Sequence, residues 1–188
     1  MRPAVLSSNL KSLLRTKLRR RVAAISPAKR REKSRKICAK IIASDFFQES
    51  RRILIYMPFR DEVDTRWIIR RALRKKKAVF LPRLSEKGMA IYRIHDLKKH
   101  LEPGSYGILE SKVRRGHKGH LSKIDVAIIP GLGFTPDGVR LGRGGGHFDR
   151  FLKNARTVIK IGVCFREQLL TKIPAEKHDV KMHFVFAG

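Results

Sequence analysis

The residues with the clearest chemical potential lie in an arginine- and glycine-rich turn, PGLGFTPDGVRLGRGGGHFDRFL at residues 130–152. The apolar run at residues 124–130 predicts a buried strand leading into this turn. The consecutive glycines at 144–146 allow several backbone N–H groups to point into one concavity. Residues 147–152 are expected to form a helix whose positive end faces a bound anion. The segment therefore predicts a phosphate site.

Charged side chains strengthen this prediction. Arg140 and Arg143 are suited to planar phosphate oxygens, and Asp149 could bind a cation that accompanies the phosphate. The spacing differs from the G-x-x-x-x-G-K-[ST] loop and from the G-x-G-x-x-G dinucleotide motif, so neither common nucleotide site is predicted. The alternative interpretation is a glycine-rich turn whose arginines are merely solvated.

The chain as a whole is sized for one domain. Its 188 residues allow a single well-buried core, and we expect one domain over residues 1–188, with residues 1–9 flexible. The formal net charge of +28 must attract polyanions. No apolar run approaches the length needed to cross a bilayer, so we expect a soluble protein with no membrane partner.

Two features bear on the compartment. Cys38 and Cys164 lie far apart without metal-site spacing, which favours buried thiols in a reducing, cytoplasmic environment. The first 25 residues are rich in arginine and contain no acid, which leaves an organelle transit peptide as an alternative.

The N-terminal third predicts two basic helices. Apolar residues recur at three- and four-residue spacing and place Lys11 and Arg15 on a shared face of the first helix. Ser26 and Pro27 end this helix and start a second one over residues 27–46. The apolar positions are Leu10, Leu13, Leu14, Leu18, Val22 and Ile25 in the first helix, and Ile37, Ile41 and Ile42 in the second.

The remainder alternates between short apolar runs and polar segments. We expect strands at residues 53–57, 78–82, 89–94, 124–130, 158–165 and 183–187, and helices at 65–76 and 167–170. Asp64 or Thr65 should cap the helix at 65–76. This order predicts an α/β fold with a mainly parallel sheet and helices on both faces, a three-layer α/β/α arrangement. Ligands in such folds bind beyond the carboxyl ends of the strands.

A polar stretch at residues 103–119 is expected to be loop. The segment HKGH at residues 117–120 contains two histidines, but no cysteine or acid accompanies them. We therefore expect a mobile surface loop there rather than a metal site.

Several motifs together resemble the 5-formyltetrahydrofolate cyclo-ligase family, also called methenyltetrahydrofolate synthetase. The resemblance covers residues 11–179, and its order and spacing fit from end to end. The motifs are RLGRGGGHFDRFL at 140–152, EVDT at 62–65, YGILE at 106–110, IGVCFREQ at 161–168 and IPAEKHD at 173–179.

The resemblance implies an ATP-dependent enzyme that makes 5,10-methenyltetrahydrofolate from 5-formyltetrahydrofolate, with release of ADP and phosphate. Transfer of the γ-phosphoryl group to the formyl oxygen would create an imidate that N10 of the folate can attack. The expected ligands are ATP, 5-formyltetrahydrofolate, including polyglutamylated forms, and Mg²⁺. We expect the enzyme to be a monomer.

The same resemblance implies roles for individual residues. Arg140 and Arg143 are the expected catalytic residues, and Asp149 and Asp179 the expected Mg²⁺ ligands. The folate site is expected to include Met57 and Glu62, with Glu62 bound to the pterin, together with Arg143, Gly144, Gly145, Gly146 and His147. The ATP site is expected to comprise Lys11, Arg15, Arg140, Leu141, Gly142, Arg143, Gly144, Gly145, Gly146, His147 and Phe148.

The chain departs from the family pattern at two places. His147 and Phe148 stand where the family commonly has two tyrosines, so a hydroxyl near the substrate is replaced by an imidazole. Ser111 stands where the family usually has proline.

Two other functions are compatible with the sequence. One is a nucleic-acid-binding protein, because the charge would drive non-specific, salt-dependent binding and basic residues between Lys11 and Lys36 could form a stripe. Aromatic content is only 7%, and no stacking platform is evident among the basic residues. The other is a homologue that binds nucleotide but has lost catalysis.

Overall fold

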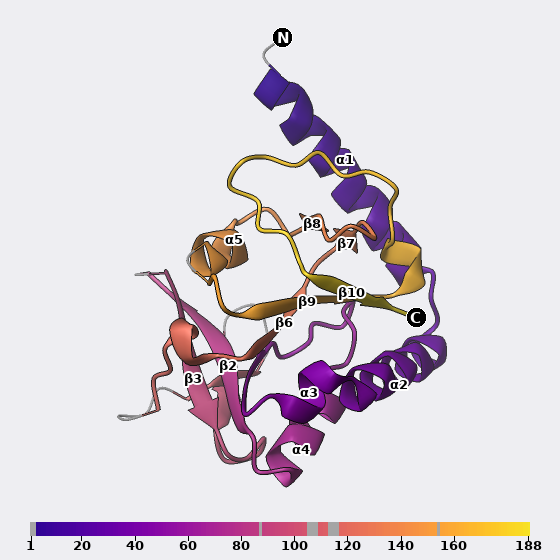
Figure 1. Cartoon of the computed structure of the whole chain (residues 1–188). Coiled ribbons are helices and arrows are strands. Elements are labelled where there is room, and N and C mark those ends of the chain that lie inside the picture. Colours follow the sequence, from indigo (N-terminus) through magenta and orange to yellow (C-terminus); the bar gives the residue numbers. More distant parts are fainter. Residues whose placement is uncertain (1–2, 87, 105–108, 113–116, 154) are drawn as a thin grey trace.

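The computed structural model describes residues 3–86, 88–104, 109–112, 117–153 and 155–188 (Figure 1). The α-helices are α1 (Pro3–Ala23), α2 (Pro27–Ala43), α3 (Asp45–Glu49), α4 (Arg66–Arg74) and α5 (His147–Leu152), and short 3-10 helices η2 (Leu121–Lys123) and η3 (Arg166–Gln168) are present. The strands are β1 (Arg52–Ile55), β2 (Ala78–Ser85), β3 (Gly88–Ile94), β4 (Leu101–Pro103), β5 (Leu109–Ser111), β6 (Val126–Pro130), β7 (Gly133–Phe134), β8 (Arg140–Leu141), β9 (Ile159–Cys164) and β10 (Phe184–Ala187).

A six-stranded sheet with the order β10-β9-β6-β1-β2-β3 forms the centre. All neighbours pair in parallel except β3, which pairs antiparallel with β2 at the edge. The prediction of a mainly parallel sheet is therefore confirmed.

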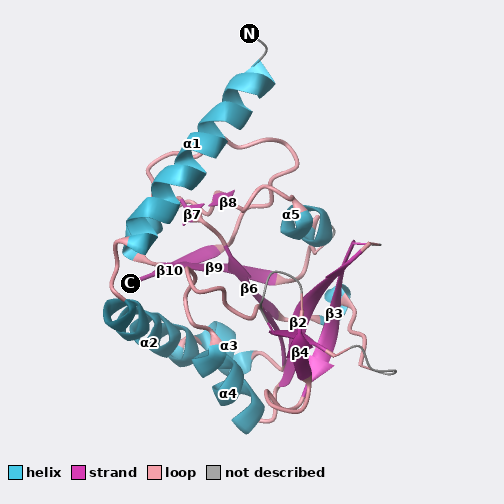
Figure 2. Ribbon diagram, turned by 180° about the vertical axis from the view of Figure 1, so that it is seen from behind, coloured by secondary structure: helices cyan, strands magenta, loops and turns pink. Residues whose placement is uncertain are grey.

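Helices cover both faces of this sheet, as Figures 1 and 2 show. Because side chains alternate along a strand, Ile53 and Ile55 of β1 point toward α2 and α4, whereas Leu54 points toward α5. A third, smaller cluster joins Leu18 of α1 to Leu141 of β8. The α/β/α arrangement is thus confirmed, with α1 packed over the β7–β8 pair.

The N-terminal helices differ from the prediction in detail. Helix α1 begins at Pro3, and Leu10 and Leu13 are exposed although their spacing belongs to the apolar pattern of this helix. Ser26 caps α2 by accepting from Lys29 N, as expected. Helix α2 ends at Ala43, because Ser44 is extended and starts the separate helix α3.

The stretch expected to be loop contains structure. Strands β4 and β5 pair within residues 101–111, and their residues are too few and too polar to signal strands in the sequence. The HKGH segment is not a free loop, because Arg93 N donates to the His117 carbonyl and Gly119 N donates to the Ile91 carbonyl. Residues 105–108 and 113–116 lie outside the described part.

Both cysteines are free and buried, and burial raises the pKa of Cys38 and of Cys164 to about 12. In the described part of the chain, no helix is long and apolar enough to cross a membrane.

Candidate functional site

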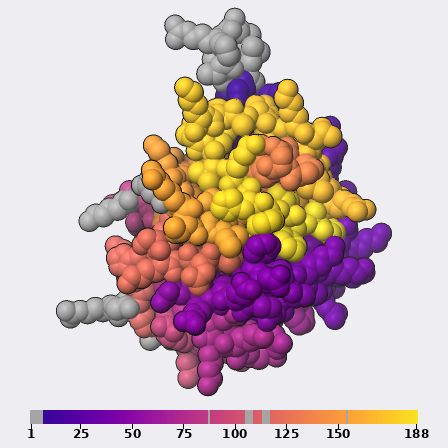
Figure 3. Space-filling view, viewed as in Figure 1, coloured from indigo at the N-terminus to yellow at the C-terminus, as the bar shows by residue number. Residues whose placement is uncertain are grey.

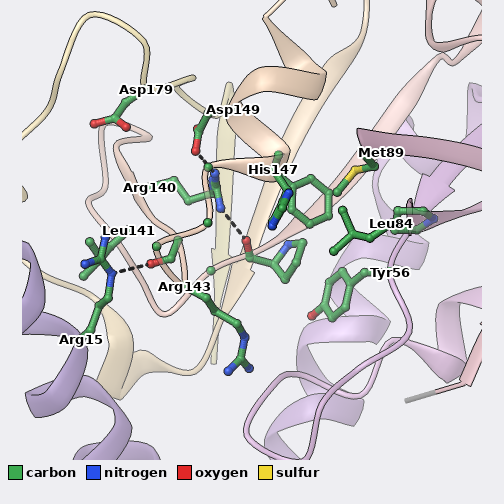
Figure 4. Close-up of a pocket in the computed structure, with 18 of the residues that line it drawn as sticks. Arg15, Tyr56, Leu84, Met89, Arg140, Leu141, Arg143, His147, Asp149 and Asp179 are labelled. Carbon is green, nitrogen blue, oxygen red and sulfur yellow. Dashed lines mark hydrogen bonds and ion pairs between the residues drawn. The ribbon is translucent and has the colours of Figure 1, made fainter. Parts of the chain in front are cut away.

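A cavity of about 660 Å³ opens beyond the carboxyl ends of β1, β2 and β6 (Figure 4). This is the position at which open α/β sheets bind ligands. Its volume lies within the usual range of small-molecule sites. All the residues expected from the sequence line this cavity: Lys11, Arg15, Met57, Glu62, Arg140, Leu141, Gly142, Arg143, Gly144, Gly145, Gly146, His147, Phe148, Asp149 and Asp179.

The glycine turn forms one wall. Gly144 has a φ of 115° and Gly146 a φ of 64°, which are backbone conformations that favour glycine. Gly146 stands immediately before the first residue of α5. Arg15 Nε donates to the Gly142 carbonyl at 3.0 Å, which ties the turn to α1.

Arg140 is the buried cation of this wall. Its side chain is only 4% exposed and pairs with Asp149, with 2.7 Å between Nη2 and Oδ2. Nη1 donates to the Pro130 carbonyl, and the guanidinium lies 5.8 Å from the centre of the Phe148 ring. Arg140 Nε is buried with no hydrogen-bond partner among the described residues. A charged donor with spare capacity beside the cavity suits an anionic ligand.

Lys11 connects α1 to the segment before β10. Its Nζ lies 2.9 Å from Glu176 Oε1 and 2.8 Å from Asp179 Oδ2. Burial alone lowers the pKa of Lys11, but hydrogen bonds and charges from both acids outweigh it and raise that pKa. Burial likewise opposes ionisation of Asp179, yet Lys11 and the Glu176 N–H hold its pKa below the ordinary value.

Arg143 connects the glycine turn to the loop after β1. Its Nη2 pairs with Asp61 at 2.6 Å and with Glu62 at 3.0 Å, and its guanidinium lies 4.4 Å from the centre of the Phe59 ring. The Glu62 side chain is 7% exposed and also accepts from Phe59 N. Burial raises the pKa of Glu62 in spite of the Arg143 charge.

His147 lines the cavity beside Phe148. Its Nδ1 lies 3.2 Å from Arg150 Nη2, which also donates to the Gly145 carbonyl at 2.7 Å. Arg150 therefore orients both the imidazole and the glycine turn.

Sequence reasoning missed the apolar end of the cavity. Leu84 and Met89 stand directly opposite each other in the β2–β3 pair, and both line the cavity. Their meeting depends on the register of a hairpin, which no local motif reveals. Glu176 and His178 were also missed, although both lie inside the IPAEKHD motif. The further lining residues are Ser8, Tyr56, Phe59, Pro82, Leu109, Glu110, Pro130 and Gly131.

The carboxylates of Asp149, Asp179 and Glu176 offer oxygen ligands of the kind that Mg²⁺ prefers. Over the described ranges, no group of three or more acids, histidines or cysteines is placed to hold a metal by itself. That donor set fits an ion held by one or two carboxylates and completed by phosphate and water.

Comparison with known proteins places the chain. A model of the 5-formyltetrahydrofolate cyclo-ligase family matches residues 7–188. The chain is 32% identical over 197 residues to the 5-formyltetrahydrofolate cyclo-ligase of Mus musculus, covering 95% of this chain and 94% of the relative. It is 30% identical over 185 residues to a probable 5-formyltetrahydrofolate cyclo-ligase of Caenorhabditis elegans, covering 92% and 90%.

Solved structures agree with this placement. The NMR structure of Aquifex aeolicus 5,10-methenyltetrahydrofolate synthetase has a TM-score of 0.84 at 29% identity, covering 95% of this chain and 89% of that one. A 5,10-methenyltetrahydrofolate synthetase from Mycoplasma pneumoniae has the same fold, with a TM-score of 0.75 at 21% identity. From its sequence and its fold, the chain belongs to the 5-formyltetrahydrofolate cyclo-ligase family of enzymes.

Proposed function

We propose that the enzyme converts 5-formyltetrahydrofolate to 5,10-methenyltetrahydrofolate at the expense of ATP, releasing ADP and phosphate. The observation that carries the proposal is the composition of a single cavity. One end combines the glycine turn with Lys11, Arg15 and Arg140, and the other combines Glu62 with an apolar hairpin wall. Two chemically different ligands can therefore meet in one site.

The basic end is assigned to the ATP phosphates. Lys11, Arg15 and Arg140 supply cations from α1 and β8, and residues 141–148 supply the turn around them. Fixed guanidinium and ammonium groups offset charge on phosphoryl oxygens, and catalysis of phosphoryl transfer consists mainly of such positioning.

The other end is assigned to the folate. Glu62 would accept hydrogen bonds from the amine and amide edge of the pterin, a role suited to a buried carboxylate. Met57, Leu84 and Met89 provide an apolar surface beside it. Arg143 and residues 144–147 lie between the two ends, where the formyl group and the γ-phosphate would meet.

The chemistry requires activation, because a formamide is a poor electrophile. In the proposed reaction the formyl oxygen attacks the γ-phosphorus and ADP leaves, giving an imidate phosphate. N10 then attacks the former formyl carbon, loses its proton and expels phosphate as the ring closes. Arg140 and Arg143 are proposed to stabilise the negative charge on the transferred group and on the departing phosphate.

We assign Mg²⁺ binding to Asp149 and Asp179. When held by these two carboxylates, the ion would offset negative charge on the ATP phosphates. Arg140 pairs with Asp149, and Lys11 pairs with Asp179. Bound ATP phosphates would pair with Lys11 and Arg140 instead, so that both carboxylates would be available to bind the ion.

The direct test is the near-ultraviolet absorbance of 5-formyltetrahydrofolate mixed with the protein and Mg-ATP. An increase that requires ATP is expected. An Asp149→Ala variant should lose about 100-fold or more of the rate, since charge stabilisation at the phosphoryl group is lost. Absence of any increase, with ATP still bound, would indicate a nucleotide-binding homologue without this activity.

Asp149 also pairs with buried Arg140, so the variant needs a control for folding. Asp137→Ala removes a carboxylate whose side chain is 64% exposed and which pairs with Lys181 outside the cavity. Thermal unfolding of both variants, together with full activity of Asp137→Ala, separates loss of chemistry from loss of fold.

A further inference from the structure

A second hollow, of about 500 Å³, lies between α2 and α4 and shares no lining residue with the proposed active site. Figures 1 and 2 show these two helices side by side on one face of the sheet. Four arginines line it, Arg31 and Arg35 from α2 and Arg66 and Arg70 from α4, and all four are exposed. We call this hollow the arginine groove.

The charge of the groove is strongly positive. Helices α2 and α4 together contain eleven lysines and arginines and one acid, Glu32. Glu32 pairs with Lys36 at 2.6 Å, and the other groove acid, Asp64, pairs with Arg66 at 2.6 Å. Within the described ranges, Arg31, Arg35 and Arg70 form no ion pair, so three guanidinium groups remain available to an anion.

An aromatic ring completes the groove. Trp67, the single tryptophan of the chain, is 45% exposed, and the Arg35 guanidinium lies 5.6 Å from the centre of its ring. The neighbouring apolar residues of α4, Ile68 and Ile69, are fully buried in the core. Exposed aromatic rings beside arginines form stacking platforms for bases, with the arginines available to phosphates.

We propose that the arginine groove binds single-stranded nucleic acid, with a base stacked on Trp67 and phosphates on Arg31, Arg35 and Arg70. A duplex would keep its bases stacked on one another and leave Trp67 without a partner. Binding to a membrane would require an exposed apolar helix face that inserts into it. The isoleucines of α4 pack into the core instead, so α4 offers no such face. The sequence pattern did not reveal a stacking platform, because this one is formed by residues of two separate helices, α2 and α4.

Because Trp67 is the single tryptophan, its fluorescence reports on the groove alone. We expect an oligouridylate or oligothymidylate of about 12 nucleotides to quench this fluorescence, in the range of site sizes known for such surfaces. Heparin, a polyanion without bases, should bind through charge with little quenching. Equal quenching by heparin, by an acidic peptide such as polyglutamate or by duplex DNA would overturn the proposal.

Substitution of Trp67 separates stacking from charge. Trp67→Ala should weaken binding of a dye-labelled oligonucleotide about tenfold in an anisotropy titration, while Trp67→Phe should keep affinity within about threefold. Heparin binding and cyclo-ligase activity should be unchanged in both variants, because Trp67 lies outside the active-site cavity. Unchanged oligonucleotide affinity in Trp67→Ala would contradict the stacking role.

Two double variants that each remove two positive charges test whether the nucleic acid binds at the arginine groove. Arg35→Gln with Arg70→Gln removes two groove charges, and Lys17→Gln with Arg19→Gln removes two exposed charges from α1. The groove variant should make the dependence of log K on log salt shallower by about 1.4, and the α1 variant should change it much less. Equal effects of the two variants would mean that only the net charge of the protein matters.

Discussion

At the scale of single residues, Glu62 is the side chain on which folate recognition depends most in this account. Its side chain is buried beside the glycine turn. Arg143 donates a hydrogen bond to one of its carboxylate oxygens, and Phe59 N donates to the other. Arg143 therefore holds Glu62 and its loop against the turn. The resemblance to the family implied a folate role for Glu62, whereas its ion pair with Arg143 depends on tertiary structure and had no signal in the sequence.

The substitution Glu62→Gln tests this role. Glutamine keeps the size and one acceptor but loses the charge, so the KM for 5-formyltetrahydrofolate should rise about tenfold, or ~1.4 kcal/mol, while the KM for ATP stays unchanged. Asp61→Asn is the matched control, because Asp61 pairs with Arg143 at 2.6 Å but does not line the cavity. Similar KM changes in both variants would mean that the effect comes from the lost ion pair with Arg143 and not from a lost contact between Glu62 and the folate.

Asp179 offers a residue-scale prediction about stability. Its side chain is 15% exposed and pairs with Lys11, so Asp179→Asn should lower the free energy of unfolding by about 2 kcal/mol at pH 7. The pKa of Asp179 is lowered in the folded chain. The pair's contribution is therefore present above the unfolded pKa and disappears as the pH falls through the folded pKa.

Urea unfolding at neutral and at acidic pH measures the difference in the free energy of unfolding between wild type and Asp179→Asn. The gap between wild type and Asp179→Asn should narrow as the pH falls below the ordinary pKa of an aspartate. Asp137→Asn, at an ion pair whose side chains are 60% and 64% exposed, should leave the free energy of unfolding nearly unchanged at either pH. A pH-independent gap at Asp179 would show that the charge of this carboxylate does not stabilise the fold.

At the scale of elements, the glycine turn is the structure that the sequence identified most fully. Its strand, its turn and the helix at residues 147–152 all form at the expected positions. Local chemistry was sufficient there, because glycine at positive φ and an apolar strand are properties of short segments. The β4–β5 pair and the Leu84–Met89 contact were not predictable in this way, because they depend on strand register.

The same limit explains the errors at the helices. Periodicity identified α1, but the neighbouring residues decide which positions are buried, and Leu10 and Leu13 are 47% and 68% exposed. The break at Ser44 follows from an extended backbone between α2 and α3, in a stretch whose apolar residues continue the helical spacing.

Gly144→Ala tests whether the backbone of the turn matters for ATP. An added Cβ would meet nothing closer than 3.7 Å, so the cost comes from the φ of 115° and should be about 1 to 2 kcal/mol. We expect the KM for ATP to rise about tenfold, because the turn must change shape.

Gly88→Ala is the control for this substitution. Gly88 has a φ of 107°. Among the described residues, no atom lies within 4 Å of an added Cβ, and Gly88 is not part of the cavity lining. Unfolding experiments should show similar destabilisation in both variants, with a change in the KM for ATP in Gly144→Ala alone. If the KM for ATP changes equally in both variants, the backbone conformation of the glycine turn does not contribute specifically to ATP binding.

At the scale of the whole molecule, the fold unites segments that are remote in sequence around one cavity. Helix α1 supplies Lys11 and Arg15, the loop after β1 supplies Glu62, and the segment before β10 supplies Asp179. Two positively charged surfaces result: this cavity, beyond the carboxyl ends of the strands, and the arginine groove between α2 and α4. Composition predicted the charge, and only the fold shows where it is concentrated.

In the proposed reaction, the γ-phosphoryl group of ATP is transferred to the formyl oxygen within this cavity. The most direct measurement uses 5-formyltetrahydrofolate labelled with oxygen-18 in the formyl group and mass spectrometry of the phosphate released with Mg-ATP. If the formyl oxygen is phosphorylated, the label appears in phosphate in step with methenyl product. Formation of product with unlabelled phosphate would contradict this transfer.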